Sequence, residues 1–241
     1  MTEVIEFKFD VETTGLDAEK NDIISLAFIL ERGNLQVKEQ ILMRPLTPET
    51  AHPRALEVHG YSLEELSTFP PPEEGLAMLF AAMDIMRGDD DAIFLPFGYN
   101  VGFDVRFLKA FWRKMGQSNY STYFSDEMLD VFKLVKRLNA VKSFGTPNLK
   151  LETMAKRFDI PISAHDALSD IMATSLLYDR LIDIPESEIL VPKGDEPFPM
   201  GKWKGVPYDE VPIGYFTWLK EQPWLGDWPQ VKKYIESISW E

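Results

Sequence analysis

Two acidic residues near the N-terminus, Asp10 and Glu12, have a spacing that could bring two carboxylates together. They end a segment in which apolar and polar residues alternate, and a period of two places every second side chain on one face of a β-strand. Two neighbouring carboxylates repel each other unless a cation lies between them. A Thr-Thr-Gly turn at residues 13–15 leaves amides and hydroxyl groups near these acids. Because carboxylate oxygens suit Mg²⁺ or Mn²⁺, the segment predicts a site for a hard metal ion.

The same spacing also arises by chance in so acidic a chain. There are 39 acidic residues among 241, and Asp17 and Glu19 repeat the spacing with no strand pattern around them. A solvated pair of surface charges is therefore the alternative interpretation of any single pair. The choice between the two depends on acids further along the chain.

Two such acids, Asp104 and Asp170, lie near predicted helix starts. Asn100 follows a buried apolar strand and has the character of a helix N-cap, which places Asp104 in the first turn of the next helix. Residues 163–166 resemble a capping box at the start of a last amphipathic helix, with His165 at its beginning. An acid at a helix start that directly follows a strand is where alternating β/α folds present their site residues.

These side chains must be positioned by a sheet whose first strands form a meander. Apolar and alternating patterns predict strands at residues 4–12, 22–30 and 35–43, with hairpin chemistry at Gly33-Asn34, a buried strand at 92–97 and a weak fifth strand near 120–124. Helical spacing is found at residues 73–86, 103–115, 128–138, 149–158 and 166–176. Composition changes after residue 184, where Pro and Gly crowd together, while four of the six Trp residues follow. The pattern predicts an α/β domain and a small folded C-terminal module.

Charge is distributed unevenly along the chain. The net charge is −14, yet residues 105–157 carry eleven basic and four acidic residues, a net charge of +7 that leaves −21 for the rest. Such asymmetry favours an anionic partner on one face, although solvated helix faces would have the same composition. The absence of Cys and the presence of three His exclude disulfides and make a structural zinc site unexpected. With no run of 18 apolar residues and no signal-peptide pattern, we expect a cytoplasmic protein without a membrane partner.

Three segments in order, residues 9–16, 100–104 and 165–170, resemble the three motifs of the DnaQ-like (DEDDh) 3′–5′ exonucleases, and the resemblance covers about residues 4–182. It implies a ribonuclease H-like fold, a five-stranded mixed sheet flanked by helices. Residues 200–205 and 215–219 are similar to the C-terminal module of exonuclease X–type proteins. We therefore expect an exonuclease domain at 1–183, a linker at 184–196 and a small module at 197–241.

The resemblance also implies an activity, the release of nucleoside 5′-monophosphates from the 3′ end of DNA, with DNA repair as the expected setting. It implies two Mg²⁺ or Mn²⁺ ions per site and a general base, His165, for which a surface histidine at a helix start is the alternative. The implied metal ligands are Asp10, Glu12, Asp104 and Asp170. Two such ions would activate water and clamp the scissile phosphate.

Substrate contacts are implied for a further set of residues, namely Thr13, Thr14, Leu16, His59 and Asn100. For His59 the alternative is a capping role, in which His59 and Gly60 end a helix and do not contact substrate. For Asn100 the alternative is that it orients the helix of Asp104 without touching substrate. This chain departs from the family at two positions: Tyr99 stands where many members have His, and Arg54 stands where an acid can occur. These departures concern how the substrate fits and not the metal ligands. In the C-terminal module, Trp203 could stack on single-stranded nucleic acid or belong to the core of the module.

Three other functions remain open at this point. A 3′–5′ exoribonuclease could use the same scaffold. A non-catalytic nucleic-acid-binding protein would be expected to lack at least one of the acids. A polymerase-associated proofreading protein would need a segment that binds its partner, and the compact tail does not resemble a flexible tether. We expect DNA 3′ ends, favouring single strands, as the partner, and the oligomeric state stays open.

Overall fold

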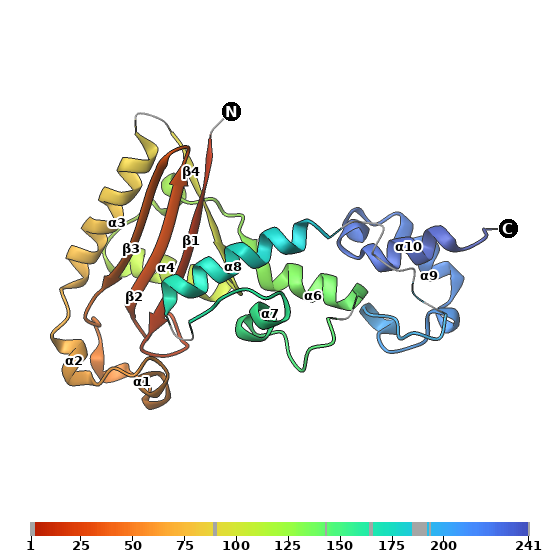
Figure 1. Ribbon diagram of the computed structural model, residues 1–241, viewed down its shortest axis with the longest axis horizontal. Coiled ribbons are helices and arrows are strands. Elements are labelled where there is room, and N and C mark those ends of the chain that lie inside the picture. Colours follow the sequence, from red (N-terminus) through yellow and green to blue (C-terminus); the bar gives the residue numbers. More distant parts are fainter. Residues whose placement is uncertain are drawn as a thin grey trace.

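A five-stranded mixed sheet forms the centre of the protein (Figure 1). The computed structural model describes residues 3–88, 91–142, 144–163, 166–184, 192 and 194–240. Its strands are β1 (Val4–Thr13), β2 (Ile23–Arg32), β3 (Leu35–Leu42), β4 (Ile93–Gly98) and β5 (Leu129–Asp130), in the order β3-β2-β1-β4-β5. The first three strands pair antiparallel, whereas β4 runs parallel to β1 and to β5. The predicted ribonuclease H-like α/β fold is confirmed.

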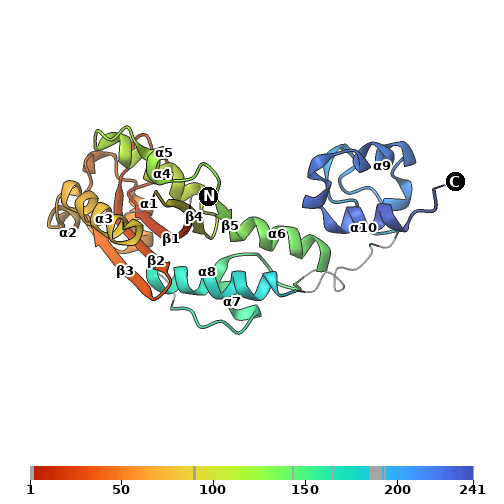
Figure 2. The same cartoon turned by 90° about the horizontal axis from the view of Figure 1, so that it is seen from above.

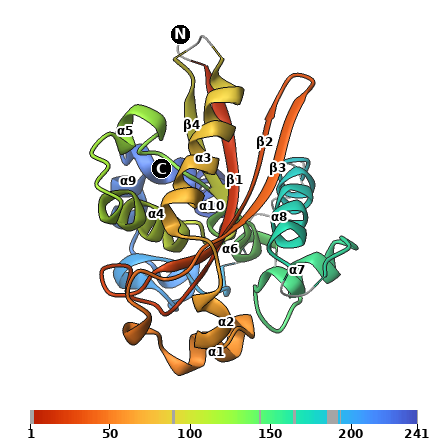
Figure 3. The same cartoon turned by 90° about the vertical axis from the view of Figure 1, so that its left-hand side faces the viewer.

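Helices cover both faces of this sheet (Figure 3). In chain order they are α1 (Pro53–His59), α2 (Leu63–Ser67), α3 (Pro72–Arg87), α4 (Gly102–Lys114), α5 (Tyr120–Tyr123), α6 (Val131–Lys142), α7 (Leu151–Arg157), α8 (Ala167–Ile182), α9 (Ile213–Lys220) and α10 (Pro229–Ser237). Short 3₁₀ turns lie at Pro48–Thr50, Gly201–Trp203, Tyr208–Glu210 and Pro223–Asp227. Helices α3 and α4 pack on one face, and α8 packs on the other with α6 and α7 beside it. None of the helices in the described ranges is long and apolar enough to span a bilayer.

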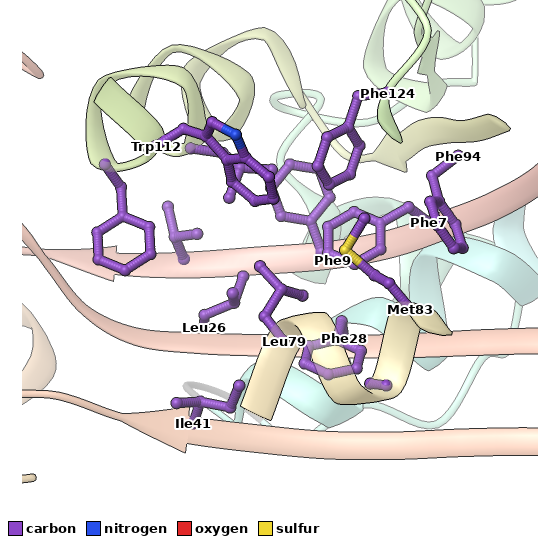
Figure 4. Packing of buried hydrophobic residues seen from close by; sticks show 14 of the residues in the cluster. Phe7, Phe9, Leu26, Phe28, Ile41, Leu79, Met83, Phe94, Trp112 and Phe124 are labelled. Carbon is purple, nitrogen blue, oxygen red and sulfur yellow. The ribbon is translucent and has the colours of Figure 1, made fainter. Parts of the chain in front are cut away.

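The alternation in β1 decides which side chains face which helices. Phe7, Phe9 and Val11 are buried in the core beneath α3 and α4. Figure 4 shows Phe7 and Phe9 beside Phe28 and Trp112, and the rings of Phe7 and Phe9 are 4.8 Å apart between centroids. Because successive side chains of a strand point to opposite faces, the two acids of β1 must face α8. The aromatic core on one face thus fixes where the carboxylates point on the other.

The predicted fifth strand near residues 120–124 is wrong. Residues 120–123 form the short helix α5, and the backbone of Phe124 pairs with Phe94 of β4 as an isolated bridge and not as part of a strand. The rings of Tyr120 and Phe124 stack at 4.7 Å, which is the contact that a helical turn allows between residues four apart. The strand that completes the sheet is β5, so the helix predicted from residue 128 begins only at α6.

Asn100 is not the N-cap of α4. Val101 occupies that position, and Asn100 has a left-handed backbone with φ of 61°. Its N–H donates to Oδ1 of Asp130 at 3.0 Å, which joins the end of β4 to the end of β5. Asn is one of the few residues besides Gly that adopts this conformation readily. Gly60, in contrast, ends α1 as predicted, with φ of 80° and its N–H bonded to the carbonyl of Leu56 at 2.9 Å.

Residues 194–240 form a lobe with a hydrophobic core of its own beyond α6 (Figure 2). Phe198, Tyr208 and Phe216 are its largest buried side chains. Arg137 of α6 reaches this lobe, donating to the carbonyl of Gly226 and lying 3.4 Å from a carboxylate oxygen of Asp227. The domain boundaries given above, at 183/184 and 196/197, stay predictions, because most of residues 185–193 lie outside the described ranges.

Candidate active site

Four acids from three elements approach one another at the end of the sheet. Asp10 and Glu12 lie on β1, Asp104 in the first turn of α4, and Asp170 in the first turn of α8. Oδ1 of Asp104 accepts the N–H of Val11 at 3.1 Å, so the start of α4 is bound to β1 between its two acids. Asp10 and Asp170 line one cavity of about 170 Å³. The structure therefore brings the four acids predicted from the sequence together.

Burial and the closeness of these acids raise the pKa values of two of them, Asp10 and Asp104. Burial raises the pKa of Asp10 well above its usual range, and the charges of Asp104, Glu12 and Asp170 raise it further. Burial also raises the pKa of Asp104 to about 7, against the opposing effect of the hydrogen bond from Val11. Like charges held together in this way leave the metal-free site with an unfavourable energy that a cation would offset.

The donor set fits a hard divalent cation in its chemistry. All four groups are carboxylates, the ligands that Mg²⁺ and Mn²⁺ prefer. Within the described part of the chain, no three acidic or histidine side chains already stand in the arrangement of a metal-binding group. The side chains would have to turn further toward one another around an ion, which the mutual repulsion of Asp10 and its neighbours opposes until the ion is present.

The start of α8 differs in detail from the capping box predicted at residues 163–166. Asp166 is itself the N-cap, and its Oδ1 accepts the N–H groups of Leu168 and Ser169 at 3.1 and 3.3 Å. The N–H of Ser163 donates instead to Oγ of Ser169 at 2.8 Å. His165, the predicted general base, lies outside the described residues.

A large apolar pocket of about 670 Å³ adjoins the acids, since Glu12 forms part of its wall. Thr13 and Leu16 line it, and the hydroxyl of Thr13 donates to the carbonyl of Gly15 at 2.7 Å. Leu16 is 85% exposed, which is unusual for an apolar side chain of this size. A pocket with these walls suits a planar apolar group such as a nucleobase.

The other three predicted substrate contacts are not part of this pocket wall. Thr14 is buried, and its hydroxyl accepts the N–H of Asp22 at 2.9 Å. Nδ1 of His59 accepts the N–H of Tyr61 at 3.1 Å, and burial lowers the pKa of this histidine. Neither residue is among those that line the pocket, nor is Asn100. A substrate role for these three residues stays a prediction.

Another part of the pocket wall comes from α1 and α4, where the sequence had singled out only Arg54, as a departure from the family that bears on substrate fit. Arg54, Ala55 and Val58 of α1 face the pocket together with Phe103 of α4. The first three have the spacing i, i+1 and i+4, which puts them on one face of a helix. That face could have been found from the sequence, but nothing in the spacing says that it turns toward the acids.

The raised pKa values predict how stability depends on pH. A carboxyl group whose pKa rises from ~3.9 in the unfolded chain to a higher value in the folded protein binds its proton more tightly when folded, so the free energy of unfolding falls as pH rises between the two values. For Asp104 this window ends at about pH 7. We expect the metal-free protein to melt at a lower temperature at pH 7.5 than at pH 5.5, and Mg²⁺ to stabilise it more at the higher pH. Equal melting temperatures in EDTA at both pH values would contradict this.

Comparison with known proteins places this geometry in a family. The family model described as "Exonuclease" (RNase_T) matches residues 7–178. The PolC-type DNA polymerase III of Halalkalibacterium halodurans is 31% identical over 185 residues, which cover 76% of this chain and 12% of that protein. The chain therefore spans only about one eighth of the length of this curated relative.

Solved structures of E. coli exonuclease I share the fold. Its complex with a dT13 oligonucleotide has a TM-score of 0.58 and 18% identity, covering 82% of this chain and 47% of that one. The zinc-bound form of its complex with single-stranded DNA has a TM-score of 0.59 and 20% identity, covering 76% and 42%. Since the family model extends over most of the sheet and its helices, this chain belongs to the exonuclease family of nucleases.

Proposed function

We propose that this protein is a metal-dependent 3′–5′ exonuclease that removes nucleoside 5′-monophosphates from DNA. The observation that carries the proposal is the approach of four carboxylates at the edge of an apolar pocket of nucleotide size. The similarity to PolC-type polymerases and to exonuclease I, which has been solved with bound oligonucleotides, favours DNA as the substrate. The exposed pocket favours a single-stranded 3′ end.

Asp10, Glu12, Asp104 and Asp170 would hold two Mg²⁺ or Mn²⁺ ions. When bound, such ions lower the pKa of a coordinated water and neutralise charge on the scissile phosphate. The chain's own residues would orient the substrate: Leu16 and Phe103 would pack against the terminal base, and the Thr13 turn would lie next to its sugar. The N–H of Val11 holds Asp104 in place for this task.

His165 would accept the proton of the attacking water. An imidazole is suited to this role because its pKa lies near neutral pH. We expect His165→Ala to lower kcat about 10²- to 10⁴-fold with little change in KM, and to remove the acidic limb of the pH–rate profile. A variant that keeps this limb would show that another group acts as the base.

The experiment that tests the function uses the purified protein with DNA and RNA of the same sequence, single- or double-stranded, labelled at the 5′ or the 3′ end. Mg²⁺, Mn²⁺ and EDTA are compared. We expect a 5′-labelled DNA strand to shorten in single-nucleotide steps with either metal and not in EDTA. Faster shortening of RNA would identify an exoribonuclease, and shortening from the 5′ end, or none at all, would refute the proposal.

A further inference from the structure

A second groove, of about 470 Å³, adjoins the apolar pocket. The two cavities share Leu16 and Asp17 in their walls. The far wall of the groove is α4, which contributes three basic side chains, Arg106, Lys109 and Arg113. Their spacing of three and four residues puts them in one row along the helix, about 10 Å long at ~1.5 Å per residue. The pocket therefore opens beside a row of cations.

The three cations are exposed, and their present partners are replaceable. Arg113 bonds to both carboxylate oxygens of Glu19 at 2.6 and 2.8 Å, and Lys109 lies 3.6 Å from Asp126. Ion pairs in this setting hold their side chains weakly, because water and salt compete for both charges. A phosphate could take the place of either acid.

Arg106 links the row to the pocket. Its guanidinium lies 5.7 Å from the ring centroid of Phe103, which lines the pocket. The next basic residue of the helix, Lys114, shows by contrast what a structural cation looks like here: its ammonium is turned inward onto the buried Asp22 at 2.8 Å. The row that lines the groove is thus a separate set, and the fold does not use it for its core.

We propose that this groove binds the phosphodiester backbone of the substrate strand on the 5′ side of the nucleotide held in the pocket. The inference rests on the proposed function. A strand carries one phosphate per ~3.4 Å of helical rise, and neighbouring phosphates lie further apart along the strand itself, so the row is long enough for about two. The whole chain carries a net charge of −14, so a nucleic-acid strand would approach only where basic residues gather locally. This row of basic residues lies directly beside the apolar pocket.

The test measures binding in EDTA, where no hydrolysis is expected, with two probes: a ten-residue oligothymidylate and thymidine 5′-monophosphate. For each phosphate of a single strand that the protein no longer neutralises, the slope of log K against log salt falls by ~0.7, which at ~0.15 M salt is about fourfold in affinity. For Arg106→Gln/Lys109→Gln we expect the Kd of the oligonucleotide to rise about 15-fold and the slope to fall by ~1.4. The Kd of the monophosphate should change less than about twofold. An unchanged Kd for the oligonucleotide, or an equal rise for both probes, would overturn the proposal.

Two further variants sharpen this result. Glu19→Gln removes the acid that competes for Arg113 and should tighten oligonucleotide binding about two- to fourfold, whereas simple damage to the surface would weaken it. Lys38→Gln is the matched control, because its ammonium lies on β3 next to Met172 of α8, across the sheet from α4, and it should leave binding unchanged. The same binding measurement is made with a DNA duplex. If the double variant loses affinity for the duplex and not for the single strand, the complementary strand occupies the groove and our strand assignment is wrong.

Failure of this inference can be told apart from failure of the proposed function. A wild-type protein that binds the oligonucleotide through this row but does not shorten it in Mg²⁺ would refute the nuclease and leave the groove assignment standing. A wild-type protein that shortens it, with normal binding in the double variant, would refute the groove alone.

Discussion

Asp10→Asn is expected to lower hydrolysis in Mg²⁺ at least about 10³-fold while making the metal-free protein more stable. Metal ions supply several kcal/mol of charge stabilisation in such reactions, and a loss of ~4 kcal/mol is about a thousandfold in rate. The same change replaces a buried carboxyl group, whose pKa is raised by burial and by three neighbouring acids, with an amide that does not ionise in the folded or the unfolded chain. We therefore expect the free energy of unfolding in EDTA to rise by about 1–2 kcal/mol.

The combination of opposite effects makes this prediction specific. Asp170→Asn should behave in the same way, whereas Asp84→Asn, a matched change on the exposed face of α3, should alter neither activity nor stability by more than about 0.5 kcal/mol. Turnover on 5′-labelled DNA and thermal unfolding in EDTA measure the two effects. Retained turnover in both Asp10→Asn and Asp170→Asn would remove the basis of the metal assignment.

Lys114→Met should destabilise the fold by about 3 kcal/mol, because it leaves the carboxylate of Asp22 buried without its cation. Asp22 is only 4% exposed in its side chain, and Nζ of Lys114 donates to its Oδ1 at 2.8 Å and to the carbonyl of Asn21 at 2.7 Å. The other oxygen of Asp22 accepts the N–H and the hydroxyl of Thr47, both at 2.7 Å. The ion pair thereby ties α4 to Asp22 directly before β2, and Asp22 in turn binds Thr47 in the loop after β3.

The neighbouring residue provides the control. Arg113→Gln removes an ion pair of similar length to Glu19, but both side chains are exposed, so the cost should stay below about 1 kcal/mol. Adding Asp22→Asn to Lys114→Met should recover part of the loss, since the remaining group is then neutral. Denaturant unfolding of these variants and the wild type measures this. Equal costs for Lys114→Met and Arg113→Gln would show that the buried pair contributes no more than a surface pair.

Much of the site could be predicted because its signals are local. The alternation through Phe7 and Phe9 fixes the face on which Asp10 and Glu12 stand, and this depends only on strand geometry. Asp104 could be placed in the first turn of its helix, and Asp170 near the start of the last helix, because helical spacing continues for many residues after each.

The rest depended on contacts between distant parts of the chain. Residues 120–124 have the aromatic composition of a strand, but the stack of Tyr120 on Phe124 and their packing on Trp112 favour a helical turn. Lys114 and Arg113 are both among the eleven basic residues of the segment 105–157, and the sequence does not distinguish them. Only the contact of Lys114 with Asp22 shows that Lys114 faces inward. For the same reason, the spacing of Arg54, Ala55 and Val58 could define one face of α1 but could not show that this face lines the pocket.

The packing of β1 also limits where this chain can change its length. A single residue inserted between Phe7 and Phe9 would rotate every later side chain of the strand by half a turn, driving Asp10 and Glu12 into the aromatic layer and Phe9 out toward α8. The tip between β2 and β3 has no such constraint, because Gly33 and Asn34 are exposed there and nothing packs within 4 Å of a side chain added at Gly33. Insertions for a tag, a label or a fused domain should accordingly be tolerated at that tip, whereas a one-residue deletion in the first strand should abolish folding and catalysis together.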